Sequence, residues 1–512
     1  MKTKNILKGL LVLGCFALLT PSCTNLDEEL YGRLTPDSFF QTEEEAVSSV
    51  AGAYNYFARM FQAGGDGWRS AEYGTDELMC PGRSNGGWLD ENVNQIMRHE
   101  IVPFNDRLNG LWNCIFPGIG LDNSLIETFE ASPLKDQLKG VIAEVRALRA
   151  YQYYYAMDCF GNVPICTDAR VSTTNLPTTS PRADVFKFVV EEFKLAIADL
   201  PSVKDVDASY YPRFTKESAQ AALAFVYLNG EVYSGKAYWK EVVDLCDAII
   251  NTGAFDLEGR VGDCFRADME GKTKEVITAI SVDKSKGVDG NQFILYAQHA
   301  TDQQKYGLPF APACGYCFDD TALNRYEEGD ERLELLEYGP QFYLDGTPIM
   351  DPDHAGQQLV LTTIKDFIAA ENNEGYRVLK YTPIGASFSG SDGNNDYIVE
   401  RYSNVLLMKA EALVRQGQQL DVALQLVNRV RNRSGLESLS ASELTLNAIE
   451  IERANEFIWE GKRRPDMIRF GSYFNTTWSY KTTVTPEWRG IYPIPAQQIS
   501  ANPNLKQNPN YE

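Results

Sequence analysis

Two segments of this chain combine aromatic rings with polar side chains, the mixture that proteins use to bind sugars. The candidate ligand-binding residues are Trp68, Tyr73, Arg83, Asn85 and Trp88 in the first segment and Tyr296, Tyr306, Tyr316 and Phe318 in the second. Aromatic planes cover the apolar C–H faces of a sugar ring, while Arg, Asn and Asp hydrogen-bond to its hydroxyl groups. Because the same rings also serve in hydrophobic cores, ligand binding and packing are equal alternatives for any one of them.

The sequence does not favour catalysis or metal binding by histidine, because the chain has only His99, His299 and His354. The sequence contains no H-E-x-x-H pair, no P-loop and no nucleotide-binding glycine fingerprint. A glycoside hydrolase needs two carboxylates at a set separation, but among 70 acidic residues such pairs arise by chance. We therefore predict a binding protein and not an enzyme, with a hydrolase as the less favoured alternative.

Eight cysteines follow the N-terminal region, and two of them form the sequence Cys314-Gly-Tyr-Cys317. This spacing resembles a redox C-x-x-C motif, but its surroundings lack the βαβ setting of a thioredoxin-type site. A disulfide that tightens the loop, or pairing with other cysteines, is the preferred interpretation. The sequence does not give the connectivity.

Two acidic loops could hold a cation: Asp351-x-Asp353 and Asp392-x-Asn394-x-Asp396. Both alternate oxygen ligands as calcium loops do, but neither has the glycine at the sixth position and the distal glutamate of an EF-hand. A structural calcium ion is therefore only a weak alternative, and the sequence predicts no cofactor.

The N-terminus has the layout of an export signal followed by a lipid-attachment site. Three lysines precede the apolar stretch 10–19, which is too short to span a bilayer as a stable helix. Leu19-Thr-Pro-Ser-Cys23 resembles a bacterial lipobox, and the acidic run 27–29 behind it resembles the surface-export tag of Bacteroidetes lipoproteins. We predict lipidation at Cys23. The alternative is a cleaved secretory signal whose Cys23 joins a disulfide.

The formal net charge is −22, and removing the leader with its lysines makes the mature chain more negative. Such a chain should repel nucleic acid and anionic lipid head groups, so attachment to a membrane would need the lipid. No later stretch approaches the roughly 20 apolar residues of a spanning helix. The remaining length is ample for a large hydrophobic core.

Helical periodicity covers much of the first half of the chain and returns near the C-terminus. Helices are predicted after the capping box of Thr42 and Glu45, over 138–155, from Pro181 to near Pro201, from Thr215 beyond Tyr227, over 239–250, 405–417 and 421–433, and from the Ser440–Glu443 capping box to Gly461. The pairs 215–250 and 405–433 have the small and bulky residue spacing of tetratricopeptide hairpins. Because one pair cannot bury its apolar face alone, we expect the pairs to stack.

Both candidate ligand-binding segments lie where this periodicity stops. Residues 63–94 are rich in glycine and show no sustained period, which predicts exposed loops. Residues 254–400 have only short apolar runs and predict a large loop-rich insertion with a few short strands. The predicted organisation is a signal peptide at 1–22, a lipid anchor and flexible acidic linker at 23–41, and one domain at 42–512, with a helical scaffold at 42–253 and 401–475 and an extended tail at 485–512.

Five segments carry a resemblance to known proteins. They are Glu144–Tyr151 with Phe160–Pro164, Phe214–Leu228, Val405–Ala412 with Val427–Leu436, Glu452–Gly471, and Tyr492–Asn504 with Gln507–Tyr511. In this order and behind a lipoprotein leader, they resemble the SusD/RagB family of outer-membrane nutrient-binding lipoproteins, and the resemblance covers essentially the whole mature chain. We expect the charged residues Arg146, Arg149, Arg463, Arg464 and Asp466 in these motifs to lock helices together and not to act in catalysis.

The resemblance implies a fold dominated by α-helices, a superhelix of tetratricopeptide-like pairs with a variable loop-rich part. It also implies a partner, a SusC-like TonB-dependent transporter over which the protein sits as a lid, and an outer-membrane location facing the cell exterior. Ligand contacts in the family come from comparable loops, which favours Trp88 and Tyr316 here. The implied function is capture of an oligosaccharide or polysaccharide for import. Capture of peptides, as in part of the family, is the main alternative, and a scaffold without a small ligand is another.

Overall fold

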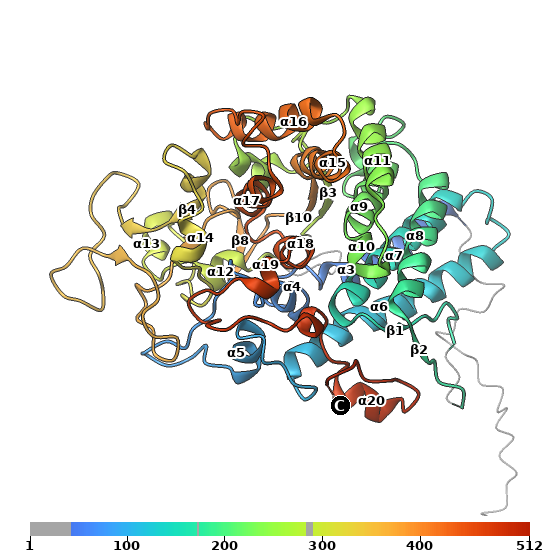
Figure 1. Cartoon of the computed structure of the whole chain (residues 1–512), viewed down its shortest axis with the longest axis horizontal. Helices are drawn as coiled ribbons and strands as arrows, with labels where there is room; N and C mark the ends of the chain where they lie inside the picture. The colour runs from blue at the N-terminus through green and yellow to red at the C-terminus, as the bar shows by residue number, and fades with distance from the viewer. Residues whose placement is uncertain (1–41, 171–173, 283–289, 512) are drawn as a thin grey trace, which may run out of the picture. The chain divides into compact units, whose positions relative to one another are not determined.

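The first half of the chain is mostly helical, and the helices predicted there are present in the structure. The computed structural model describes residues 42–170, 174–282 and 290–511, which pack as one unit. The leader, Cys23 and the linker to residue 41 lie outside the described residues. The helices of the first half are α2 (Glu43–Ser49), α3 (Ala51–Ala58), α4 (Asp66–Glu72), α5 (Glu91–Met97), α6 (Asp106–Ala131), α7 (Lys139–Phe160), α8 (Arg182–Asp199), α9 (Lys216–Leu228), α10 (Gly230–Ser234) and α11 (Trp239–Thr252) (Figure 1).

These helices stack in pairs, as the sequence predicts. Helix α6 packs against α7, α7 against α8, α8 against α9 and α9 against α11. The stack then continues into the C-terminal half, because α11 also contacts α15 (Tyr402–Gln416), which packs on α16 (Leu420–Arg433). Figure 1 shows these helices together, apart from the irregular chain that carries α12 to α14. The remaining C-terminal helices are α17 (Leu446–Glu456), α18 (Arg463–Phe470), α19 (Ser472–Asn475) and α20 (Ala496–Ala501).

Helix boundaries follow from local side-chain and backbone chemistry. The hydroxyl of Thr42 accepts the N–H of Glu45 at the start of α2, and Thr215 forms a reciprocal capping box with Ser218 at the start of α9. Helix α15 ends at Gly417, whose φ of 64° is a left-handed conformation that glycine adopts without steric cost. These ends agree with the sequence-based prediction.

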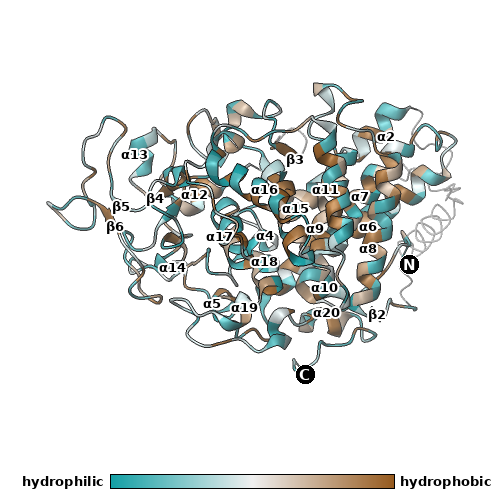
Figure 2. Ribbon diagram, turned by 45° about the horizontal axis from the view of Figure 1, so that its top comes forward, coloured by the Kyte–Doolittle hydropathy of each residue, from teal (hydrophilic) through white to brown (hydrophobic). Residues whose placement is uncertain are grey.

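The burial pattern of each helix reflects its place in the stack. Helix α11 buries Val242, Cys246 and Ile249, which share one face, and it presents hydrophilic residues on the other (Figure 2). Helix α7 lies between α6 and α8 and is buried on all sides from Ala147 to Phe160. A helix covered on all sides needs no narrow apolar stripe, so α7 accommodates tyrosines and paired polar side chains as well.

Two elements of the N-terminal half differ from the prediction. Helix α6 is absent from the sequence-based prediction; it contains Pro117, and the side chain of Asn105 caps its first turn. The segment 63–94, predicted as exposed loops, contains α4 and the start of α5 and is mostly buried up to Arg83. The prediction was wrong here because the glycines of this segment permit close packing against other chain segments, which a local pattern does not show.

The helix predicted from Ser440 to Gly461 is shorter than expected. Helix α17 begins after Thr445, whose hydroxyl accepts the N–H of Ala448 at 3.1 Å, and it ends at Glu456. Ser440 and Glu443 close a turn instead, in which the Ser440 N–H donates to the Glu443 carboxylate at 2.7 Å. The hydroxyl groups of Ser440 and Thr445 offer the same capping chemistry, but a helix follows only Thr445.

The loop-rich insertion is closed by a strand pair. Strand β3 (Val276–Ile280) pairs antiparallel with β10 (Tyr397–Arg401), so residues from the first part of the insertion lie beside residues at its end. The other strand pairs are β1 (Val163–Pro164) with β2 (Thr179–Ser180), β4 (Leu336–Glu337) with β7 (Arg377–Val378), β5 (Gly339–Pro340) with β6 (Val360–Leu361), and β8 (Phe388–Ser389) with β9 (Asp392–Gly393). Short helices α12 (Phe293–Ala297), α13 (Asp302–Tyr306) and α14 (Asp320–Leu323) complete the insertion.

Buried cations satisfy the backbone of this irregular part. The Arg377 guanidinium donates to the carbonyl oxygens of Gly375 and Asn372 at 2.8 and 2.9 Å. The Lys380 ammonium donates at 2.8 Å to the carbonyl of Glu456, the last residue of α17, and so ties the insertion to that helix. A loop can be buried only if its polar backbone groups are paired, and these side chains supply the donors that a helix or sheet would otherwise provide.

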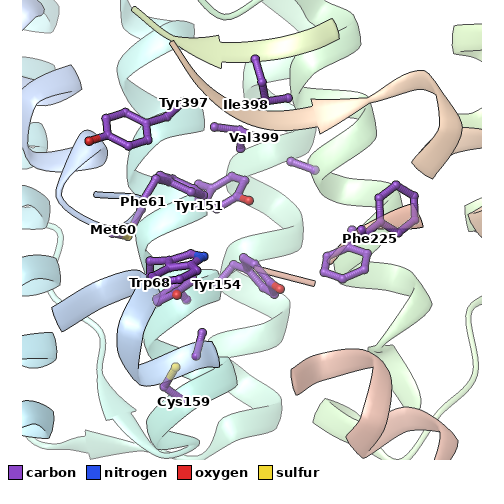
Figure 3. Close-up of a cluster of buried hydrophobic side chains, with 14 of the residues drawn as sticks. Met60, Phe61, Trp68, Tyr151, Tyr154, Cys159, Phe225, Tyr397, Ile398 and Val399 are labelled. Carbon is purple, nitrogen blue, oxygen red and sulfur yellow. The ribbon is translucent and has the colours of Figure 1, made fainter. Parts of the chain in front are cut away.

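An aromatic core lies where α3, α4 and α7 meet (Figure 3). Phe57 contacts both Phe61 and Tyr151 edge to face, with 5.1 Å between ring centroids in each case. Trp68 on α4 extends this core toward the loop-rich part. The next residues of the chain lead to the surface where the two candidate ligand-binding segments meet.

Candidate functional site

The structure brings the two candidate ligand-binding segments together. The N–H of Met79 donates to the Cys317 carbonyl at 2.7 Å, and the N–H of Cys317 donates back at 3.0 Å. Close by, the Arg83 guanidinium donates to the Gly315 carbonyl at 3.4 Å. Residues more than 200 positions apart therefore form one local structure.

Four of the candidate residues, Trp68, Tyr73, Tyr316 and Phe318, lie in the core, where each is at most 2 % exposed. Trp68, Phe293, Tyr316 and Trp459 form what we call the buried aromatic cluster, in which the Trp68 ring lies 4.7 Å from Phe293 and 5.7 Å from Tyr316. A ligand cannot reach these rings without opening the core. The expectation of ligand contact at these positions is therefore corrected, including the favoured Tyr316, because packing uses their ring faces.

Arg83 also has a structural role and not a ligand-binding one. Its guanidinium donates to the carbonyl oxygens of Glu371 and Glu374, each at 2.8 Å, and the side chain is buried. Burial and the neighbouring Arg377 lower the pKa of Arg83. Asn85 is exposed and Tyr306 is half-buried. Arg83 thus ties the two segments together, and it is not available to a ligand.

Trp88 and Tyr296 are the candidate aromatic residues that keep partly exposed rings close to each other. Their ring centroids lie 5.6 Å apart with an interplanar angle of 87°, and both side chains are half-buried. The Trp88 indole N–H donates to the Ala313 carbonyl at 2.9 Å, which fixes the ring. The ring also covers Gly315, where an added Cβ would come within 2.5 Å of it.

The backbone of Trp88 has a φ of 64°, a left-handed conformation that is unusual for a bulky residue. Gly86 and Gly87 precede it with φ values of 94° and 92°. Such a conformation persists only when surrounding contacts hold it, and it occurs often at ligand-binding sites. The indole hydrogen bond and the contact with Gly315 are these contacts.

Two polar residues that the sequence did not indicate stand beside these rings. The Arg69 guanidinium carbon lies 5.4 Å from the Tyr296 ring centroid, and Gln292 donates to the Asp392 carboxylate at 2.8 Å. A Cβ added at Gly64 would lie 2.7 Å from the Gln292 amide oxygen and 3.3 Å from the Tyr296 ring. We call Gly64, Arg69, Trp88, Gln292 and Tyr296 the aromatic surface. It offers ring faces and hydrogen-bonding groups, which suits a sugar.

Arg69 could have been found from a helical interpretation of residues 66–72. In helix α4, Trp68 points into the core, and its neighbour Arg69 is turned by about 100° toward the surface. Gln292 has no such signal, because it reaches the aromatic surface only through the fold of the insertion.

The motifs considered for redox and metal chemistry take structural roles in the described residues. All eight cysteines there are free, so neither a disulfide between Cys314 and Cys317 nor pairing of either with another described cysteine is found. Burial raises the pKa of the Cys80 thiol to about 12, which makes it unreactive. Asp351 accepts from the Asp353 N–H at 2.8 Å, and Asp396 accepts from the Tyr211 hydroxyl at 2.6 Å.

No group of three or more His, Cys, Asp or Glu side chains in residues 42–170, 174–282 and 290–511 is placed to hold a metal ion. A structural calcium ion therefore stays an untested expectation. Within these ranges, no helix is long and apolar enough to cross a membrane.

A separate cavity of about 270 Å³ lies between the scaffold and the insertion. Tyr211, Arg213, Phe255, Glu270 and Asp396 are among its lining residues. Burial and the neighbouring Asp396 raise the pKa of the Glu270 carboxyl to about 8. None of the candidate residues lines this cavity, so it is distinct from the aromatic surface.

Two family models match this chain. One, described as the SusD family, matches residues 315–511, and the other, described as starch-binding associating with outer membrane, matches residues 35–228. The starch-binding protein SusD of Bacteroides thetaiotaomicron is 23 % identical over 413 residues, which cover 72 % of each chain. A SusD-like protein of Bacteroides ovatus is also 23 % identical and covers 92 % of this chain and 86 % of its own.

Solved structures share the fold along nearly the whole chain. Surface glycan-binding protein A from Bacteroides thetaiotaomicron, solved in complex with laminarihexaose, has a TM-score of 0.74 at 22 % identity and covers 91 % of this chain and 99 % of its own. A laminarin binding SusD-like protein has a TM-score of 0.74 at 21 % identity, with 92 % and 100 % covered. The helix-pair architecture with its loop-rich insertion is common to these proteins.

Proposed function

Because this chain belongs to the SusD family, we propose that it binds a glycan through the aromatic surface. The observation that carries this proposal is the pair of half-buried rings, Trp88 and Tyr296, held 5.6 Å apart where the two loop segments meet. A sugar ring stacks on such rings through its C–H faces, and Arg69 and Gln292 can answer its hydroxyl groups. The names of the relatives, a starch-binding protein and glycan-binding proteins, support a binding function that breaks no bond.

The ligand contact is tested by the substitution Trp88→Ala. Because central aromatic anchors carry most of the binding free energy of a site, affinity for the recognised glycan should fall about tenfold or more. Isothermal titration calorimetry with oligosaccharides from a glycan array measures the loss. Trp488→Ala is the matched control, because Trp488 is also half-buried but packs on Tyr511 in the C-terminal tail. Equal affinity of the Trp88 variant and the wild type would refute this site.

We further propose that the protein is lipid-anchored at Cys23 in the outer membrane, faces the cell exterior, and acts as the lid of a SusC-like TonB-dependent transporter. The family description, which associates the matched region with the outer membrane, supports the location. The lipobox-like sequence before Cys23 supports the anchor. A tether of this kind would raise the local concentration of the lid beside its barrel.

The anchor and the partner are tested together on the native protein. Affinity capture from detergent-solubilised outer membranes should recover a TonB-dependent barrel, and mass spectrometry of the mature N-terminal peptide should show acyl chains on Cys23. Recovery of the protein alone with an unmodified Cys23 would contradict both. Peptides recovered with the complex in place of glycans would favour the peptide alternative.

A further inference from the structure

Arg69 is held rigidly at the aromatic surface. Its Nε donates to the Ala63 carbonyl at 2.9 Å, and its guanidinium carbon lies 5.4 Å from the Tyr296 ring centroid and 5.8 Å from that of Tyr316. The hydroxyl of Tyr316 donates to the same Ala63 carbonyl at 2.7 Å. The guanidinium is thus oriented before any ligand arrives, which reduces the entropy that binding would cost.

The two terminal nitrogens of Arg69 have no hydrogen-bond or ion-pair partner among the residues that the structure describes. Asp66, three residues before Arg69 on the same helix, pairs with Arg107 at 3.4 Å and lies against the backbone of Gly110. Arg107 in turn pairs with Asp90 at 2.6 Å. The charge of Asp66 is therefore shared with another arginine, and the terminal nitrogens of Arg69 stay available.

This arrangement differs from that of the other arginines around the first segment. Arg83 donates to loop carbonyls, and Arg463 forms a two-pronged pair with Asp76 at 2.7 and 2.8 Å. The chain as a whole is strongly acidic, with a net charge of −22, so carboxylates to pair with Arg69 are not scarce. A half-buried guanidinium beside two aromatic rings is partly desolvated, and it gains most from an anionic partner.

We infer that Arg69 recognises an anionic group on the ligand, so the aromatic surface takes an acidic glycan that carries a carboxylate or a sulfate ester. The planar fork of arginine matches either group with two parallel hydrogen bonds. A sugar ring packed against the exposed parts of Trp88 and Tyr296 would place its substituent within reach of Arg69, since Tyr296 contacts both Trp88 and Arg69. The Gln292 amide oxygen, which faces Gly64, accepts from a hydroxyl of the same sugar. This inference rests on the proposed function and names its ligand class.

The test compares charged and neutral ligands of the same length. The probes are tetragalacturonate with its methyl ester, and a sulfated galactotetraose with its unsulfated counterpart, each titrated calorimetrically into the full mature chain. We expect at least one charged member to bind about tenfold more tightly than its neutral partner. This preference should shrink between 50 and 500 mM salt, because screening weakens the ion pair. The pair that shows the preference distinguishes carboxylate from sulfate.

The substitution Arg69→Met should abolish the preference, because it should lower the affinity for the charged member about tenfold more than the affinity for its neutral partner. Arg59→Met is the matched control, because Arg59 is exposed and its guanidinium lies over the Tyr56 ring, 4.6 Å from the centroid. Thermal unfolding of both variants should match the wild type within a few degrees, which excludes misfolding as the cause.

The inference is overturned if no charged probe exceeds its neutral partner, or if Arg69→Met weakens both members of a pair equally. The second outcome would leave Arg69 as a donor to hydroxyl groups only, with no role in recognising charge. If neutral oligosaccharides bind and Trp88→Ala abolishes that binding, the proposed function survives such a result. If no oligosaccharide binds, neutral laminarin oligosaccharides included, the proposed function itself fails.

Discussion

The two tryptophans of the first candidate segment have opposite surroundings. Trp68 lies on helix α4, whose regular backbone turns the ring into the buried aromatic cluster, where its indole N–H donates to the Trp459 carbonyl at 3.3 Å. Trp88 lies in a glycine-preceded loop with a left-handed backbone, and its ring stays half-buried beside Tyr296. Residue type alone would give both the same role. The comparison shows that the ring of Trp68 contributes to the stability of the core, whereas the ring of Trp88 keeps an exposed part that a ligand can contact.

The two regions are nevertheless in contact through Tyr316. Its ring lies 5.7 Å from Trp68 on one side and 5.7 Å from Trp88 on the other. Tyr316 is itself fully buried. The aromatic surface therefore packs directly on the buried aromatic cluster, through Tyr316. Variants on each side of Tyr316 should separate stability from binding.

The largest effect is expected for Trp68→Ala. Removing a large buried ring leaves a cavity and should lower the free energy of unfolding by about 3–5 kcal/mol. Trp88→Ala should lower it by about 1 kcal/mol or less, because its ring is already half in water. Urea unfolding followed by circular dichroism measures both values. A Trp68 variant of unchanged stability, or one that loses affinity while fully folded, would break the comparison.

A second effect concerns Glu72, which lies on the same helix as Trp68 and is buried. Burial and the nearby Glu77 raise the pKa of Glu72, and the pKa of Glu77 is itself raised to about 7. A raised pKa in the folded state means that the unfolded chain releases its proton first, so stability falls as pH rises above the unfolded value.

Glu72→Gln removes this penalty. The variant should match the wild type near pH 4.5 and exceed it at pH 8 by about 1–3 kcal/mol. Chemical unfolding across this pH range gives the difference directly, and Glu43→Gln, at an exposed position in the first turn of α2, is the control. A difference that does not grow with pH would show that Glu72 has a partner that stabilises its charge. Glycan affinity at the aromatic surface should not change.

The smallest effect is expected for Tyr316→Phe, which keeps the ring and removes the hydroxyl that bonds to Ala63. The loss should be about 1 kcal/mol in stability, because Arg69 continues to donate to the same carbonyl. Affinity for a neutral glycan should be unchanged, since the ring still supports Trp88. A stronger effect on affinity than on stability would place Tyr316 in direct ligand contact and restore the sequence-based expectation.

The scaffold was largely predictable because helical periodicity and caps are local signals. The start of α9 at Thr215 and the end of α15 at Gly417 follow from capping chemistry within a few residues. Helix α6 was not predicted because it contains Pro117 and several glycines. These residues are local signals for a helix break, which the surrounding packing overrides. The insertion was correctly expected to be irregular with short strands.

The candidate site was only partly predictable. The sequence indicated the two segments, and Trp88 and Tyr296 among their residues do lie together at the surface. It could not tell them from Trp68 or Tyr316, because burial depends on which distant segment covers a ring. Arg69 and Gln292 went unnoticed since neither belongs to a motif.

The sequence by itself determined the helical pairs, the family and the presence of two aromatic segments outside the helices, because periodicity, caps and motifs are written along the chain. Tertiary structure decided which ring stays partly exposed and that the two terminal nitrogens of Arg69 have no partner among the described residues. Those properties depend on contacts such as that between Met79 and Cys317, which bring distant segments together. In loops without a period, burial depends on which distant segment covers a residue, and the local sequence does not indicate it.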